Sequence, residues 1–114
     1  MSEMAKTLRK KEIEDGLAIA LSYLQKEFPN SNISIIDPDD PNGVPDRDPR
    51  LGLSRSFWID YKGPQRIIFT IKVLETLSKT SKPVNMLRQW GVADFIRNSD
   101  RVPIKVTLQG PEHL

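Results

Sequence analysis

The sequence predicts an α+β domain, an antiparallel sheet of about four strands with two or three helices packed on one face. Two observations predict this class. Apolar residues recur at helical spacing near the N-terminus and again after residue 83, and they alternate along several short segments elsewhere. The expected order is helix, strand, long loop, strand, strand, helix and strand. With 114 residues the chain has room for one modest core, so we expect a single domain over residues 1–114.

The first helix is expected over residues 8–28, where apolar residues recur at steps of three or four: Ile13, Leu17, Leu21, Leu24 and Phe28. Thr7 is the expected N-cap. The helix should end at Phe28 because a residue that precedes proline leaves the α region. Gly16 falls inside the helix, where a glycine costs about 1 kcal/mol relative to alanine.

Three strands are expected in the first two thirds of the chain. The β-branched run 32–36 predicts one strand, and segments 57–61 and 66–73 predict a hairpin across Lys62-Gly63-Pro64-Gln65. Alternation gives each hairpin strand one apolar face for the core. The opposite face is mixed, and it should carry Trp58, Arg66, Ile68, Thr70 and Lys72.

The last third predicts a helix and a final strand. Pro83 suits the first turn of a helix that runs to about residue 97, and Gly91 is a position at which this helix could divide. Apolar residues then alternate from Val102 to Leu108. Pro103 indicates an edge strand or the beginning of a strand. If a neighbouring chain adds to the sheet, we expect it to do so at this strand, with Pro103 limiting the pairing at its start.

Residues 37–50 separate the two patterned halves and contain five aspartates and four prolines. Each proline removes a backbone donor and restricts the preceding residue, which excludes a helix and a central strand. The sequence therefore predicts a long Asp/Pro-rich loop over residues 37–55. Loops of this length within compact domains are usually functional or disordered.

The oxygen-rich loop suggests a calcium site, because Ca²⁺ prefers six to eight oxygen ligands. The candidate ligands are Asp37, Asp39, Asn42, Asp46 and Asp48. Their spacing resembles the aspartate-rich calcium repeats of extracellular proteins, but an extra residue stands between Asp39 and Asn42. No glutamate follows at the EF-hand distance. The alternatives are a solvated loop whose aspartates bond to their own backbone, and a loop that binds a basic partner through residues such as Asp39 and Asp46.

The composition argues against most catalytic chemistry. The chain has no cysteine, and its one histidine, His113, falls in a tail that we expect to be frayed. Thiol nucleophiles, histidine-based triads and histidine metal sites are therefore not expected, and no glycine-rich phosphate loop occurs. We expect neither enzymatic activity nor a cofactor.

The chain is also expected to be cytoplasmic and to have no membrane partner. No apolar run reaches the roughly 18–20 residues that cross a bilayer. The N-terminal segment contains charged residues early and lacks the apolar centre of a signal peptide.

The function expected is that of a small interaction domain that binds a protein partner or forms a homodimer. The mixed hairpin face, with Trp58, Arg66, Ile68 and Lys72, is the candidate partner-binding surface. The alternative is a nucleic-acid-binding regulator. Residues 51–114 hold ten Lys and Arg against five acids, and the candidate contacts are Trp58, Arg66, Lys72, Lys79, Lys82 and Arg88.

One short segment is similar to a known nucleic-acid-binding family. The helix-then-hairpin order, with Gly63-Pro64-Gln65-Arg66 leading to Phe69, resembles a double-stranded-RNA-binding domain. That family carries a histidine near the Gly-Pro turn and a lysine cluster at the start of its last helix. This chain has Arg66 at the first position and only Lys79 and Lys82 near the second, so we place no function on the resemblance.

Overall fold

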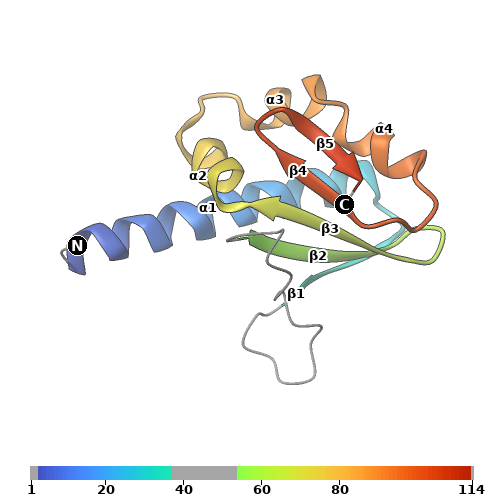
Figure 1. Ribbon diagram of the computed structural model, residues 1–114, viewed down its shortest axis with the longest axis horizontal. Coiled ribbons are helices and arrows are strands. Elements are labelled where there is room, and N and C mark those ends of the chain that lie inside the picture. The colour runs from blue at the N-terminus through green and yellow to red at the C-terminus, as the bar shows by residue number, and fades with distance from the viewer. Residues whose placement is uncertain (1–2, 37–53, 114) are drawn as a thin grey trace.

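The computed structural model describes residues 3–36 and 54–113 of the chain, and this part has an α+β fold (Figure 1). Its helices are α1 (Glu3–Glu27), α2 (Ile71–Lys79), α3 (Pro83–Gln89) and α4 (Val92–Arg97). Its strands are β1 (Asn32–Ile36), β2 (Ser54–Asp60), β3 (Pro64–Thr70), β4 (Ile104–Thr107) and β5 (Gly110–His113). None of the helices in the described ranges is long and apolar enough to span a membrane.

The five strands form one mixed sheet in the order β1-β2-β3-β4-β5. The first three pair antiparallel, β4 runs parallel to β3, and β5 returns antiparallel to β4. The expectation of a purely antiparallel sheet was therefore wrong at β3–β4. Helices α2, α3 and α4 carry the chain back to the end of the sheet where β3 began, so the next strand must run in the same direction as β3.

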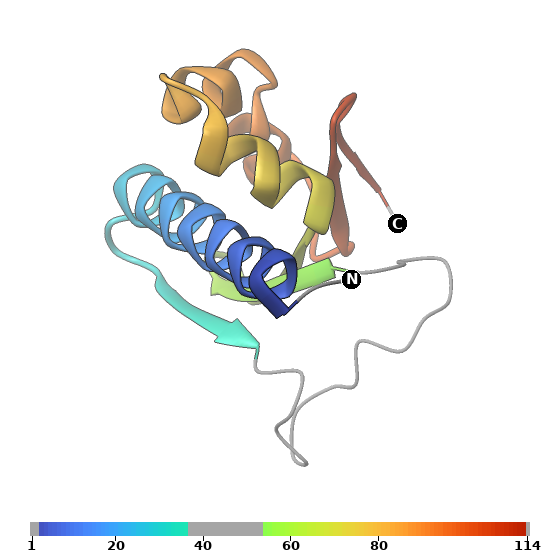
Figure 2. The ribbon, with the colours of Figure 1, turned by 90° about the vertical axis from the view of Figure 1, so that its left-hand side faces the viewer.

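The helices pack together on one face of the sheet, as expected. In Figure 2 the sheet curves around them, with β1 and β2 below the helices and β4 and β5 beside them. The core lies between the two layers. Its fully buried sheet residues are Phe57, Ile59, Ile67, Phe69, Ile104 and Val106, and its fully buried helical residues include Leu24, Leu74, Leu77, Leu87 and Ile96.

Helix α2 begins where the sequence predicted that a strand would continue to Val73. Thr70 ends β3 and caps the helix, because its Oγ1 accepts a hydrogen bond from the Val73 amide at 3.3 Å. From Ile71 onward the apolar residues follow the helical period, and Ile71, Leu74 and Leu77 are buried against the core. Lys72 is consequently an exposed helical residue and does not belong to the sheet.

At Gly16 the backbones of α1 and α2 approach each other closely. A Cβ atom at this position would overlap the carbonyl group of Leu74 and would lie 2.8 Å from its Cα, below the 3.0 Å that real Cβ atoms keep. The obstacle is backbone, so it cannot rotate away. The sequence alone suggested only that Gly16 weakens the helix. The structure shows that the absence of a side chain at Gly16 allows the two helices to pack in contact.

Helix α4 is attached to the C-terminal half of α1 at two points. The buried hydroxyl of Tyr23 accepts a hydrogen bond from the Ala93 amide at 3.1 Å, which satisfies a donor in the first turn of α4. The Arg97 guanidinium donates to the Glu27 carbonyl at 2.9 Å and to the Glu27 carboxylate at 3.2 Å. The hydrogen bond to the Glu27 carboxylate raises the pKa of Arg97.

Several local expectations can be compared with the observed elements. Strand β1 and the end of α1 before Pro29 are confirmed, and Gly91, with φ of 67°, separates α3 from α4. Helix α1 starts at Glu3, so Thr7 lies within it and is not its N-cap. The strand expected over Val102–Leu108 corresponds to β4, which lies between β3 and β5 and is therefore not an edge; Pro103 instead stands directly before its first residue, Ile104.

The expectation of a frayed tail around His113 was also wrong. His113 belongs to β5, its ring lies 4.8 Å from that of Phe95, and its Nε2 is 2.8 Å from the Ser99 hydroxyl. Strand β5 pairs with β4 from Gly110 to His113, which fixes this segment through backbone hydrogen bonds.

Substitution of Gly16 by alanine should destabilise the protein by about 2 kcal/mol or more, since overpacking against backbone forces the two helices apart. In an exposed helical position the same change would stabilise by about 1 kcal/mol. Ala18 is exposed on the same helix and provides the control, because Ala18→Gly should cost only about 1 kcal/mol. Urea unfolding measures both, and a Gly16→Ala variant more stable than the parent would contradict the packing.

The stability contributed by Tyr23 should fall at alkaline pH. Burial raises the pKa of its hydroxyl. Because the folded pKa lies above the unfolded value of about 10, the contribution is complete below pH 10 and is lost as the pH rises through the folded pKa. Tyr23→Phe should be about 1 kcal/mol less stable than the parent at pH 8. Urea unfolding should show this difference shrinking above pH 10, and a constant difference would contradict it.

Candidate functional site

The mixed hairpin face exists, although its members differ in how accessible they are. Trp58 on β2 stands directly opposite Arg66 on β3, and Ile68 lies two positions further along the same face. Trp58 and Arg66 are partly exposed, and burial lowers the pKa of the Arg66 guanidinium. Ile68 has no accessible surface, so a partner could reach its side chain only by displacing its neighbours.

The predicted loop residues cannot be placed in the same way. The calcium candidates Asp37, Asp39, Asn42, Asp46 and Asp48 all lie outside the described residues, so that prediction remains a prediction. Across residues 3–36 and 54–113, no three His, Cys, Asp or Glu side chains gather as a metal site would require.

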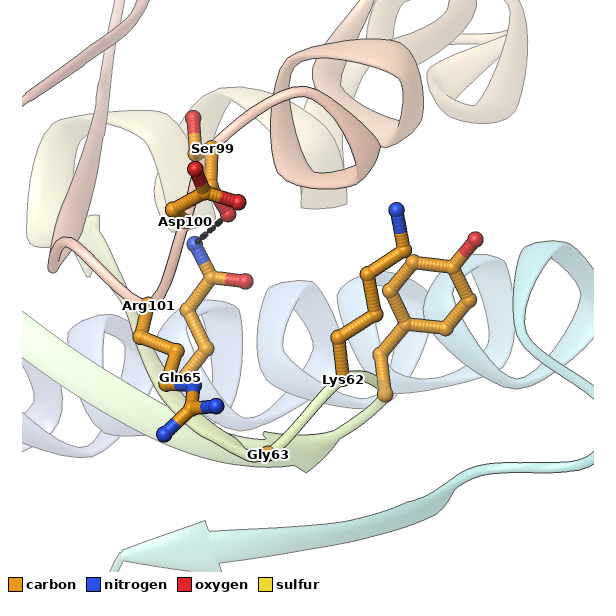
Figure 3. A pocket seen from close by; sticks show the side chains of 7 residues that line it. Lys62, Gly63, Gln65, Ser99, Asp100 and Arg101 are labelled. Carbon is orange, nitrogen blue, oxygen red and sulfur yellow. Dashed lines mark hydrogen bonds between the residues drawn. The ribbon is translucent and has the colours of Figure 1, made fainter.

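A pocket that sequence reasoning missed lies at one end of the sheet (Figure 3). It opens between the β2–β3 turn and the connection from α4 to β4, and its volume is about 430 Å³. We call it the turn pocket. Its lining residues come from these two segments: Tyr61, Lys62, Gly63 and Gln65 from the first, and Ser99, Asp100 and Arg101 from the second.

Gln65 joins the two walls of the turn pocket. Its side chain is only 4% exposed, and its Nε2 donates to the carbonyl oxygens of Ser99, at 3.3 Å, and Val102, at 3.1 Å. Both amide hydrogens are therefore used, which fixes the orientation of the group. The side-chain oxygen, Oε1, points into the space between Gln65 and Lys62 (Figure 3). The sequence placed Gln65 in a turn, whereas it belongs to β3 and pairs with Ile59.

Two unusual backbone conformations bring the walls together. Gly63 has φ of 116° in the β2–β3 turn, and a Cβ there would lie 2.9 Å from the Nε of Arg101. Arg101 itself has φ of 59°, a left-handed conformation that costs a non-glycine residue on the order of 1–3 kcal/mol. Residues held in such conformations cluster at functional sites, where the surrounding structure maintains them.

Ser99 connects the pocket wall to β5. Its hydroxyl donates to the Phe95 carbonyl at 2.6 Å, so its single hydrogen is already used. The hydrogen bond of 2.8 Å between Ser99 and His113 must then be donated by Nε2 of the imidazole. This contact fixes the wall and holds the imidazole in the tautomer that cannot accept a proton from Ser99.

The rim of the turn pocket combines apolar and charged groups. Tyr61, which lines the pocket, is 39% exposed, and Val102, which follows the lining residue Arg101 in the chain, is 40% exposed. The Tyr61 ring packs edge-to-face against Phe28 at 5.2 Å, which limits its movement, and the Lys62 Nζ lies 5.5 Å from the centre of the same ring. The turn pocket is thus a preformed hollow with one aromatic wall, the Tyr61 ring, held by Phe28.

No protein-family model, curated protein or solved structure matches this chain. Any function must therefore be argued from the geometry of the described residues.

Replacement of Gln65 by leucine should destabilise the protein by about 1–3 kcal/mol, because two carbonyl oxygens near the pocket lose their donor. Gln89 is exposed on α3 and offers a matched control, where the same substitution should change stability by less than about 0.5 kcal/mol. Urea unfolding of the two variants measures the difference. Equal effects would show that the Gln65 hydrogen bonds do not hold the two segments together.

Proposed function

We propose that this protein is a small binding domain without catalytic activity of its own, which acts through a protein partner or a second copy of itself. The observation that carries the proposal is the preformed turn pocket, whose lining includes the exposed ring of Tyr61 and whose lining residue Arg101 is followed in the chain by the exposed apolar residue Val102. Apolar anchors beside a polar pocket, with charged groups around them, are typical of protein interfaces.

The rigidity of the pocket supports this proposal. Gln65 fixes both walls through its two hydrogen bonds, and Phe28 restrains the Tyr61 ring. A surface whose side chains are already ordered loses little conformational entropy when a partner binds. The most suggestive catalytic pair of the described residues, Ser99 and His113, has the wrong hydrogen-bond direction for activating a serine nucleophile.

The nucleic-acid alternative receives less support because its residues do not share a surface. Trp58 and Arg66 lie on the sheet, on the face away from the helices, whereas Lys72 and Lys79 lie on α2. Lys79 pairs with Glu12 at 3.4 Å, and Arg88 lies 3.8 Å from Glu27. Nucleic-acid binding therefore remains a prediction from the charge of the sequence.

Substitution of Val102 by glutamate should weaken the association of the protein, because it places a charge on an exposed apolar residue next to the pocket-lining residue Arg101. Leu108 is 43% exposed in the connection between β4 and β5, so Leu108→Glu is the matched control. Light scattering at several concentrations measures self-association. Affinity capture from the source cells, followed by mass spectrometry, measures binding to other proteins.

We expect the parent protein to self-associate or to capture a partner. Val102→Glu should lower the affinity of that association at least tenfold, and Leu108→Glu should leave it unchanged. Association that is equally sensitive to both substitutions would contradict the proposed surface. Binding to mixed-sequence nucleic acid that weakens steeply with salt would favour the alternative.

A further inference from the structure

We infer that β1 is the surface through which a second copy of this chain binds, in an antiparallel pairing of two β1 strands across a two-fold axis. The inference goes beyond the proposed function because it concerns a different surface. It assigns self-association to β1 and leaves the turn pocket to another protein. It follows from the topology of the sheet, the composition of β1 and the fit of β1 to itself.

Strands β1 and β5 form the two edges of the sheet in the described part of the chain. In Figure 2, β1 lies on the opposite side of the sheet from β5. An edge strand has backbone N–H and C=O groups that no neighbouring strand uses, so it can pair with a strand of another molecule. The sequence placed any added strand at residues 102–108, but the strand found there, β4, is internal.

The two edges differ in how well they are protected from such pairing. Natural edge strands are protected by proline, by charged side chains or by a bulge. Strand β5 contains Pro111, which has no backbone N–H, and the exposed Glu112. Strand β1 has the sequence Asn-Ile-Ser-Ile-Ile, without proline or charge, and it pairs with β2 over all five residues without a bulge. The edge on which a further strand can be added is therefore β1.

Ile35 supplies an apolar contact at this edge. Ile33 and Ile35 stand opposite Ile59 and Phe57 of β2, so they lie on the face of the sheet that carries the core. Ile33 is half-buried and packs against the core, whereas Ile35 is 45% exposed. An exposed β-branched side chain on the core face of an edge strand becomes more buried when another strand is added beside it.

Strand β1 is complementary to itself in an antiparallel pairing centred on Ser34. In this register Ser34 lies opposite Ser34 of the second copy, and Ile35 lies opposite Ile33 of the second copy. Directly opposite residues share a face, so each Ile35 meets an isoleucine on the core face. Ser34 is exposed on the other face, beside Trp58 of β2, where two serines can form a hydrogen bond. Because β1 has no charge, the pairing brings no like charges together.

The same features limit the assembly to two copies. Pairing uses β1 of both molecules, and the edges that remain are the two β5 strands, which proline and charge protect. A strand of five residues is a small contact compared with the roughly 800 Å² that each partner buries in a standard interface. We therefore expect a weak, reversible dimer.

The test is sedimentation equilibrium of the full chain from about 10 μM to about 1 mM, the range in which weak complexes form. We expect a monomer–dimer equilibrium in the parent protein. Ser34→Lys should weaken the dimer about fivefold, because it places two like charges directly opposite each other at the axis. Ser34→Glu should do the same for the same reason. An equimolar mixture of the two variants should form a heterodimer at least as stable as the parent dimer, because opposite charges then face each other.

Two further variants control the test. Ser81 is exposed in the connection between α2 and α3, so Ser81→Lys makes the same change in charge and should leave the dimer unchanged. Ile35→Thr keeps a β-branched side chain and should weaken the dimer about threefold, because it removes apolar contact. A parent that stays monomeric at the highest concentration would overturn the inference. So would a dimer that neither Ser34→Lys nor Ile35→Thr weakens.

The result also separates this inference from the proposed function. A dimer that Ser34→Lys weakens and Val102→Glu leaves unchanged supports the β1 contact, and capture of another protein then tests the turn pocket alone. Self-association that Val102→Glu weakens and Ser34→Lys leaves unchanged would overturn the inference and support the turn pocket as the interface.

Discussion

The contact between α1 and α2 at Gly16 is the constraint on which the rest of the arrangement depends. Helix α2 begins immediately after β3, so the place where it docks on α1 directs α3 and α4 along the same side of the sheet. The chain must then return to the end of the sheet where β3 starts, because β4 pairs with β3 in parallel. This return places residues 99–101 beside the β2–β3 turn, and the turn pocket is the consequence of that topology.

The connection that lines the pocket is held from both sides. Tyr23 and Arg97 attach α4 to the C-terminal half of α1, and this fixes the residue from which the connection departs. Gln65 binds the connection again at Ser99 and Val102 before β4 begins. The left-handed backbone of Arg101 is tolerated between these attachments, whose combined hydrogen bonds offset a local cost on the order of 1–3 kcal/mol.

The sequence predicts the elements that depend on local patterns of residues. It does not predict the features that depend on contacts between residues far apart in the chain. The amphipathic α1, strand β1, the hairpin and the division at Gly91 follow from periodicity and from proline and glycine positions. Helix α2 was missed because Ile71 and Val73 fit strand alternation as well as the first turn of a helix. Strand β5 has almost no apolar residues and forms through pairing with β4. The role of Gln65 depends on partners 34 and 37 residues away, which no local pattern encodes.

The central claim is that Gln65 holds the turn pocket in a fixed form, with its oxygen directed into it. The most direct measurement is the hydrogen-exchange rate of the Gln65 side-chain amide by NMR, compared with Gln25, Gln89 and Gln109, which are exposed in the same protein. If the amide is buried and doubly bonded, its exchange should be slower than theirs by orders of magnitude. Exchange at the rate of the exposed glutamines would contradict the account.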